Sequence, residues 1–266
     1  MKRMANLVTL TTDFGDSQGC VGIMKGVMAC INLNVKFIDM AHDIPSHDVF
    51  HAAFVLKTAY RYFPEGTVHL AVVDPGVGGS RRPIAVRTDM YYFVGPDNGL
   101  FTYIYGENEF DVREITEAKY TLGVDSTTFD GRDIFAPVAA YLSLGVSIEQ
   151  FGQEISDPVR LDIYRPEYGK GFIKGHVIHI DQFGNLITDI KRDESEQVMD
   201  FRDVRIRAGD LVIERVSGAY SDGPPGEPVC VWGSHGHLEV AVSQGRAVDS
   251  IEGMGRGAEV FVQANE

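Results

Sequence analysis

The chain has 266 residues, with 24 Lys and Arg against 38 Asp and Glu, and a formal net charge of −14 at pH 7. This balance argues against a nucleic-acid partner, because binding to phosphates needs clustered basic side chains. The length suits two domains, and no apolar run is long enough to span a bilayer, so we expect a cytoplasmic protein without a membrane partner. Cys20, Cys30 and Cys230 lack metal-ligand or redox-pair spacing, which argues against a disulfide framework or a zinc site.

Strands and helices alternate through the first half of the chain. A strand-like run over 7–12 predicts a first strand that leads into Asp13. Helical spacing follows over 20–31, with Asp16 or Ser17 as the expected helix cap. Further strands are expected over 35–39, 68–74, 84–87 and 91–94, and further helices over 49–63 and 134–144. This alternation is typical of a mostly parallel sheet covered by helices.

The stretch HLAVVDPGVGGSRR, residues 69–82, places an acid at the end of a buried strand. Asp74 follows the apolar run 70–73, and ligands of open α/β sheets collect just beyond the carboxyl ends of such strands. The glycines after Asp74 permit unusual backbone torsions, so that Arg81 or Arg82 could return to face the acid. The alternative interpretation is a tight turn with a surface ion pair.

Two acids precede the predicted helix at 134–144. Asp133 falls in the first helical turn, where a carboxylate favours the positive helix terminus, so a structural role is expected for it. Asp130 has no such explanation. His42 and His47, in the polar loop AHDIPSHD, are interpreted as groups that pack the loop rather than as ligands.

The composition changes near residues 156–171, and short alternating runs replace the helical pattern. From Phe172 onward, the runs are separated by Gly, Asp and Pro turns, which is typical of a small antiparallel barrel or sandwich. We therefore expect an amino-terminal, mostly parallel α/β sandwich domain over 1–168 and a smaller carboxy-terminal antiparallel β-barrel domain over 169–266.

Two loops of the second half have the chemistry of binding groups. Asp181, Phe183 and Asn185 supply an acid, an aromatic face and an amide, which suit an amine and a stacked purine, although a simple hairpin turn also explains them. The segment 233–236, Gly-Ser-His-Gly, could offer backbone N–H groups to a carboxylate, or serve only as a loop.

Seven segments in order carry a resemblance that covers nearly the whole chain: LTTDFGD, AHDIPSHD, FPEGTVHLAVVDPGVG, GPDNGL, TFDGRDIFAP, IDQFGN and GSHGHLEVA. The set resembles the S-adenosyl-L-methionine hydroxide adenosyltransferases, relatives of the fluorinase and chlorinase enzymes. The resemblance implies an α/β domain followed by a β-barrel, and a homotrimer whose active sites lie between neighbouring subunits. It also implies hydrolysis of S-adenosylmethionine, as the substrate, to adenosine and L-methionine, with no cofactor and no metal.

The resemblance also implies roles for residues that match the family's motifs. Asp13 would hold the ribose hydroxyls, and Asp16 or Ser17 would lie near the methionine end. In the second half, the implied substrate-binding residues are Asp181 for the methionine amine, Phe183 and Asn185 for adenine, Tyr220 near the base, and Ser234 with His235 in its loop for the carboxylate. Acidic acceptors suit a diol or an ammonium group, and backbone donors suit a carboxylate.

The family's catalytic Asp–Arg–His set is matched here by Asp74 and Arg81, but Asp130 stands at the histidine position. We expect water to attack the ribose 5′-carbon, with Asp74 and Asp130 orienting it and Arg81 fixing Asp74. Two carboxylates, and Gly131 in place of a hydroxyl residue, argue against halide as the nucleophile. The alternatives are a non-catalytic S-adenosylmethionine-binding module, a halogenase, and a metal-dependent phosphohydrolase built on Asp13 and Asp74.

Overall fold

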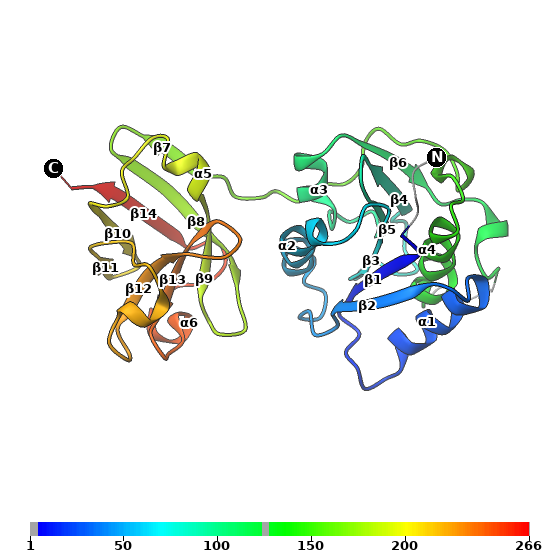
Figure 1. Ribbon diagram of the computed structural model, residues 1–266, viewed down its shortest axis with the longest axis horizontal. Helices are drawn as coiled ribbons and strands as arrows, with labels where there is room; N and C mark the ends of the chain where they lie inside the picture. Colours follow the sequence, from blue (N-terminus) through cyan, green and yellow to red (C-terminus); the bar gives the residue numbers. More distant parts are fainter. Residues whose placement is uncertain (1–4, 124–127, 266) are drawn as a thin grey trace. The chain divides into compact units, whose positions relative to one another are not determined.

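The computed structural model describes residues 5–123 and 128–265 (Figure 1). The chain divides into two compact units, one up to Leu161 and one from Asp162. The first unit is a helix-covered sheet and the second is built of antiparallel strands. This confirms the predicted fold class, while the domain boundary near residue 168 stays a prediction.

The first unit contains a six-stranded sheet in the order β2-β1-β3-β5-β4-β6. Neighbouring strands pair in parallel from β2 to β5, and β4 runs antiparallel to both β5 and β6. The strands span β1 Leu7–Thr12, β2 Lys36–Ala41, β3 Val68–Val72, β4 Pro83–Thr88, β5 Tyr92–Pro96 and β6 Phe110–Glu114. The sheet is therefore mostly parallel, as predicted.

Helices cover both faces of this sheet (Figure 1). They span α1 Cys20–Ile31, α2 Val49–Ala59, α3 Thr102–Glu107 and α4 Ala136–Ser143. Because side chains alternate along a strand, Val72 packs into the core that α1 and α4 share, whereas Ala71 and Val73 pack into the core of α2 and α3. Both faces of the central strands are buried under helices. Polar residues that could bind a ligand therefore lie in the loops that follow the carboxyl ends of β1 and β3.

Two helix starts differ from the sequence prediction. Gly19, in a left-handed conformation with φ of 72°, stands at the N-cap of α1 without a side-chain cap, so the expected capping by Asp16 or Ser17 is wrong. The helix predicted from residue 134 is preceded by a π turn over Gly131–Phe135, and such turns are frequent at functional sites. Asp133 is buried there and its Oδ1 accepts a hydrogen bond from Arg132 Nε at 2.6 Å.

The second unit is an antiparallel sheet in the order β11-β10-β14-β8-β9-β13-β12, with β7 paired to β8. In β10, buried apolar residues alternate with exposed arginines, so one face of the sheet packs on a core and the other faces solvent. The strands span β7 Glu167–Gly169, β8 Phe172–Ile180, β9 Leu186–Lys191, β10 Val204–Ala208, β11 Leu211–Ile213, β12 Pro228–Trp232, β13 His237–Val242 and β14 Glu259–Ala264. Short helices, α5 Arg192–Ser195 and α6 Ala247–Ser250, follow β9 and β13.

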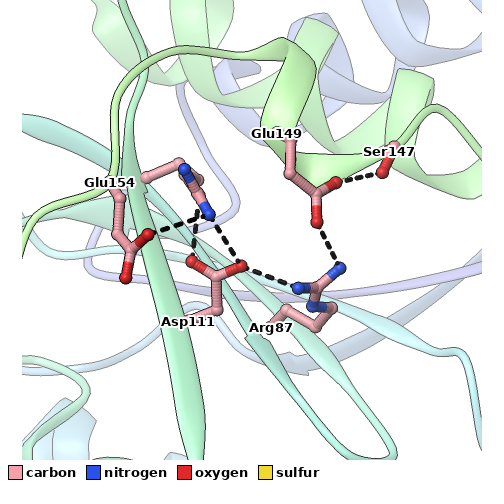
Figure 2. A network of polar contacts seen from close by, with 6 residues as sticks. Arg87, Asp111, Ser147, Glu149 and Glu154 are labelled. Atoms are coloured by element: carbon pink, nitrogen blue, oxygen red, sulfur yellow. Dashed lines mark hydrogen bonds and ion pairs between the residues drawn. The ribbon is translucent and has the colours of Figure 1, made fainter.

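A network of charges ties the end of the first unit to the edge of its sheet (Figure 2). Arg87 on β4 donates to Asp111 on β6 and to Glu149, at 2.7 Å in both cases. Arg113 on β6 pairs with both Asp111 and Glu154. These groups are partly exposed, so each pair adds little stability, but together they fix the segment that leads toward the second unit.

Candidate functional site

Asp13 and Asp74 follow the two neighbouring parallel strands β1 and β3. The register pairs Thr12 with Val72, so the two strands end at the same edge of the sheet. The Asp13 Oδ2 accepts a hydrogen bond from the backbone N–H of His47 at 2.9 Å. The acids predicted at strand ends therefore lie at the edge where open α/β sheets bind ligands.

Arg81 bridges two carboxylates that are far apart in the chain. Its Nε donates to Asp74 Oδ2 and Oδ1 at 2.9 and 3.1 Å, and its Nη2 donates to Asp74 Oδ2 at 2.5 Å. The same Nη2 donates to Asp130 Oδ2. The three side chains are nearly buried, with 11% of Arg81, 5% of Asp74 and 10% of Asp130 exposed. The structure thus brings together all three predicted catalytic residues.

The glycine turn allows Arg81 to return to Asp74. A Cβ atom on Gly76 would lie 3.2 Å from the Arg81 Cγ, tighter than ordinary contact, so a bare backbone suits this position. The guanidinium also lies over the ring of Phe135, 5.3 Å from its centroid. Burial by itself would lower the pKa of Arg81, but its hydrogen bonds to the two carboxylates raise it, so the guanidinium stays charged.

Arg82 points to a different cluster. Its Nε donates to Asp97 Oδ2, and its Nη1 donates to Asp157 Oδ1, both at 2.8 Å. Asp97 in turn accepts the backbone N–H of Val159. Arg82 therefore fixes the segment near the end of the first unit, and Arg81 is the arginine that faces Asp74.

The loops after β1 and before α4 meet through aromatic rings. The rings of Phe14 and Phe129 pack edge to face, with centroids 5.8 Å apart. Between them lies Gly131, whose added Cβ would be 3.2 to 3.4 Å from both rings and from the Met24 sulfur. This packing holds the segment of Asp130 against the loop of Asp13, while Asp16 and Ser17 are exposed on that loop.

His42 fixes the same loop from the side of β2. Its Nδ1 is hydrogen-bonded to Thr12 Oγ1 at 2.9 Å, its Nε2 contacts Asp39 Oδ1 at 3.0 Å, and its carbonyl accepts the N–H of Gly15. The side chain is nearly buried. These contacts agree with the interpretation of His42 as a loop-packing group.

In the second unit, an open hollow of about 710 Å³ collects the remaining predicted residues. Its lining includes all the substrate-binding residues expected in this half, namely Asp181, Phe183, Asn185, Tyr220, Ser234 and His235. Phe183 is 64% exposed, so its ring face is open to stack on a planar ligand. The hollow combines this ring with acids and a loop of small residues.

Asp181 organises the turn that forms one wall of the hollow. Its Oδ1 accepts the backbone N–H groups of Phe183 and Asn185 at 2.9 and 2.8 Å, and its Oδ2 accepts Asn185 Nδ2 at 2.9 Å. Residues 181–185 thus form a turn between two strands, as the hairpin interpretation predicted. It is compatible with binding, since each carboxylate oxygen accepts more than one hydrogen bond.

Glu239 is a lining residue that the sequence analysis did not single out. It lies on β13 and is 2% exposed, yet its carboxylate contacts both Tyr220 and His235. The signal in the sequence was an acid within the apolar strand LEVAV. Burial raises the pKa of Glu239, and the hydrogen bond from Tyr220 acts in the opposite direction.

A larger hollow of about 830 Å³ lies elsewhere in the second unit, beside Trp232 and Phe201. Its arginines are paired with acids, Arg192 with Glu196 and Arg202 with Asp200. It contains none of the predicted residues, and size alone does not make a site, so we assign the candidate site to the smaller hollow and the Arg81 cluster.

Within residues 5–123 and 128–265, no three His, Cys, Asp or Glu side chains gather as a metal ion would require. Among the helices of these same residues, none has the length and apolar character needed to cross a membrane.

The family of the chain follows from comparison with known sequences. Residues 8–152 match the N-terminal domain of the SAM hydroxide adenosyltransferases, and residues 175–260 match the C-terminal domain. The chain belongs to the SAM hydroxide adenosyltransferase family. Each of the two matches falls within one of the two units, and the resemblance seen in the seven segments is confirmed.

Several relatives of this chain have names that state an activity. A protein of Methanocaldococcus jannaschii is 41% identical over 194 residues, covering 71% of this chain and 68% of its own. One of Thermus thermophilus is 36% identical over 258 residues, covering 93% and 97%. Both are named (R)-S-adenosyl-L-methionine hydrolase. A fluorinase of an Actinoplanes species is 26% identical over 268 residues, covering 88% and 90%.

Solved structures agree with the fold of this family member. The crystal structure of an uncharacterised conserved protein from Thermotoga maritima matches with a TM-score of 0.89 and 36% identity, covering 96% of this chain and 99% of the other. A conserved hypothetical protein from Thermus thermophilus matches with a TM-score of 0.79 and 34% identity, covering 96% and 98%.

Proposed function

We propose that this protein hydrolyses S-adenosyl-L-methionine to adenosine and L-methionine by attack of water on the ribose 5′-carbon. The observation that carries the proposal is the buried bridge of Arg81 between Asp74 and Asp130. Relatives that are 36% to 41% identical and named as hydrolases of the (R) epimer support it, and we infer that the same epimer is the substrate here.

The chemistry follows from the charges of this cluster. Asp74 and Asp130 accept hydrogen bonds from the attacking water and aim its lone pair at the 5′-carbon, while Arg81 holds both acids in place. The C–O bond forms as the C–S bond breaks, and the bonding pair stays on sulfur as a neutral thioether. The water proton passes to a carboxylate and then to solvent. No general acid is needed, because the leaving group requires no proton.

Two carboxylates against one guanidinium also select the nucleophile. A halide in this place would meet like charges without added positive charge, and a buried unpaired anion is costly. Gly131 contributes no hydroxyl, and the contacts around it restrict an added side chain. Halogenation is therefore a weak third choice, after hydrolysis and the non-catalytic binding module, even though fluorinases are among the relatives.

The remaining predicted residues would bind the substrate. We assign Asp13 to the ribose hydroxyls and Asp16 or Ser17 to the methionine end. In the hollow of the second unit, Asp181 would bind the amine, Phe183, Asn185 and Tyr220 the adenine, and Ser234 and His235 the carboxylate. The acids would also attract the sulfonium cation, most strongly where water is excluded.

We further propose a cytoplasmic homotrimer in which neighbouring subunits complete each active site. The catalytic bridge belongs to the first unit, and the hollow belongs to the second unit. A substrate held at its ribose by one unit and at its adenine and amino-acid ends by another would require both.

The test is to incubate metal-stripped protein with (R)-S-adenosyl-L-methionine in ¹⁸O-labelled water without halide, and to analyse the products by mass spectrometry. Adenosine that carries ¹⁸O at the 5′-position, together with L-methionine, is the expected result. Unchanged substrate that still binds in calorimetry would refute hydrolysis and favour the non-catalytic binding module. Protein that leaves S-adenosylmethionine unchanged, but hydrolyses a phosphate ester once Mg²⁺ is added, would favour the phosphohydrolase alternative.

A further inference from the structure

Glu239 lies in the middle of the wall formed by β9, β13 and β12. It pairs across the sheet with Ile187 and Val231, and its neighbours Leu238 and Val240 point into the barrel core. Alternation along the strand therefore turns Glu239 to the opposite face, where it lines the hollow. An acid at such a buried strand position is unusual unless its charge is satisfied.

Two side chains from separate loops satisfy this carboxylate. Tyr220 Oη donates to Glu239 Oε2 at 2.5 Å, and His235 Nε2 lies 3.2 Å from Oε1. Tyr220 begins a short helical turn before β12, and His235 is in the loop between β12 and β13. One buried group thus fixes two side chains of the hollow that otherwise belong to independent loops.

The local backbone is shaped around this carboxylate. A Cβ atom on Gly233 would lie 1.6 Å from Glu239 Oε1, so only glycine leaves room for the acid at this point of the Gly-Ser-His-Gly loop. Burial raises the pKa values of both Glu239 and Tyr220, as expected for groups held together away from water. The loop of residues 233–236 and the Glu239 carboxylate therefore pack against each other and depend on each other for their positions.

We propose that Glu239 is a positioning residue that holds Tyr220 for the adenosyl group and His235 for the amino-acid end of the substrate. This inference rests on the function proposed above, which assigns those two side chains to opposite ends of one ligand. The consequence is specific, because a change at Glu239 must weaken the binding of both ends, whereas a change at either partner weakens only one.

The experiment measures the binding of adenosine and of L-methionine separately, by calorimetry on the full-length assembled protein, together with kcat and KM for S-adenosylmethionine. We expect Glu239→Gln to raise both dissociation constants and KM by about tenfold, with kcat changed by less than about twofold. Tyr220→Phe should weaken adenosine alone, and His235→Gln should weaken methionine alone. In the Glu239→Gln background, the effect of Tyr220→Phe should shrink, because the contact is already lost.

The matched control is Asp189→Asn on the neighbouring strand β9. Asp189 is also a buried acid, but it accepts a hydrogen bond from the backbone of His176 and does not line the hollow. We expect this variant to lose thermal stability without a change in either dissociation constant. Unchanged affinities in Glu239→Gln, or full additivity with Tyr220→Phe, would overturn the inference while leaving hydrolysis intact. Wild-type protein that binds neither ligand nor substrate would overturn both proposals.

Discussion

Arg81 binds Asp74 through the edge of its guanidinium group, and its Nε donates to both carboxylate oxygens, at 2.9 and 3.1 Å. Because the same guanidinium also donates to Asp130, it sets the distance between the two acids. A lysine has a single ammonium group, which cannot reproduce this forked geometry. The arginine is therefore the member of the cluster whose shape, and not only its charge, matters.

Arg81→Lys should lower kcat by roughly 10- to 100-fold, as expected for the loss of hydrogen bonds to charged groups. Steady-state kinetics with S-adenosylmethionine measure this loss. The matched control is Arg82→Lys, which disturbs the pairs with Asp97 and Asp157 and should reduce stability with kcat retained. Equal losses of kcat in both variants would contradict the assignment of Arg81 to the catalytic cluster.

Asp130→His restores the family's catalytic set, and we expect it to retain or raise turnover. An imidazole accepts a proton only when neutral, so the rate of this variant should fall as the pH drops below about 6.5, the ordinary pKa of histidine. The wild-type rate should not show that fall. Asp130→Asn serves as the control and should lose activity while still binding substrate. Turnover that is lost in Asp130→His, with folding and binding intact, would mean that the carboxylate has a role no histidine replaces.

Co-expression of two inactive variants tests whether subunits share active sites. Asp74→Asn disables the first unit, and Asp181→Asn disables the hollow of the second. If each site of a trimer combines one unit from each of two neighbours, every mixed trimer contains one intact site, and random mixing restores about a quarter of the activity. Two different affinity tags isolate the mixed assemblies, and light scattering measures their mass. Sites confined to single subunits would give no recovery.

His69 provides a pH test of stability outside the active site. It is buried beside Tyr60 and Tyr91 and stacks on Phe93, and burial lowers its pKa from 6.5 to about 3. Below pH 6.5 the unfolded chain binds a proton there and the folded chain does not, so folding becomes less favourable as the pH falls toward about 3. We expect the free energy of unfolding to drop by about 1.4 kcal/mol per pH unit from this group alone.

Urea unfolding between about pH 7.5 and about pH 5 measures this dependence. His69→Phe removes the titrating group, so its stability should change less steeply with pH than that of the wild type. The variant also loses the hydrogen bond to Thr9 Oγ1, which costs stability equally at every pH. Parallel pH profiles for the two proteins would show that the pKa of His69 is the same in the folded and unfolded chains, which would contradict the lowering by burial.

Much of the fold was predictable because hydrophobic periodicity reports local structure. Leucine, valine and threonine in β1 indicated a strand from near neighbours alone. The alternation of apolar residues with arginines in Val204–Ala208 did the same for a barrel strand. The start of α1 was not predictable in this way. A left-handed Gly19 turns the chain there, so Asp16 and Ser17 remain in an exposed loop instead of capping the helix.

The candidate site also has features that near neighbours in the sequence predict and features that depend on tertiary contacts. By itself, the sequence determined that acids follow β1 and β3 and that Asp181 closes a turn with Asn185, because these features depend on residues within a few positions. The residues alone left open whether Arg81 or Arg82 faces Asp74, and the tertiary structure shows Arg81 on Asp74 and Arg82 on Asp97. It also decided that Asp130 joins Arg81 across 49 positions, and that Glu239 joins Tyr220 across 19, because such contacts exist only after the sheet and the barrel bring distant loops together.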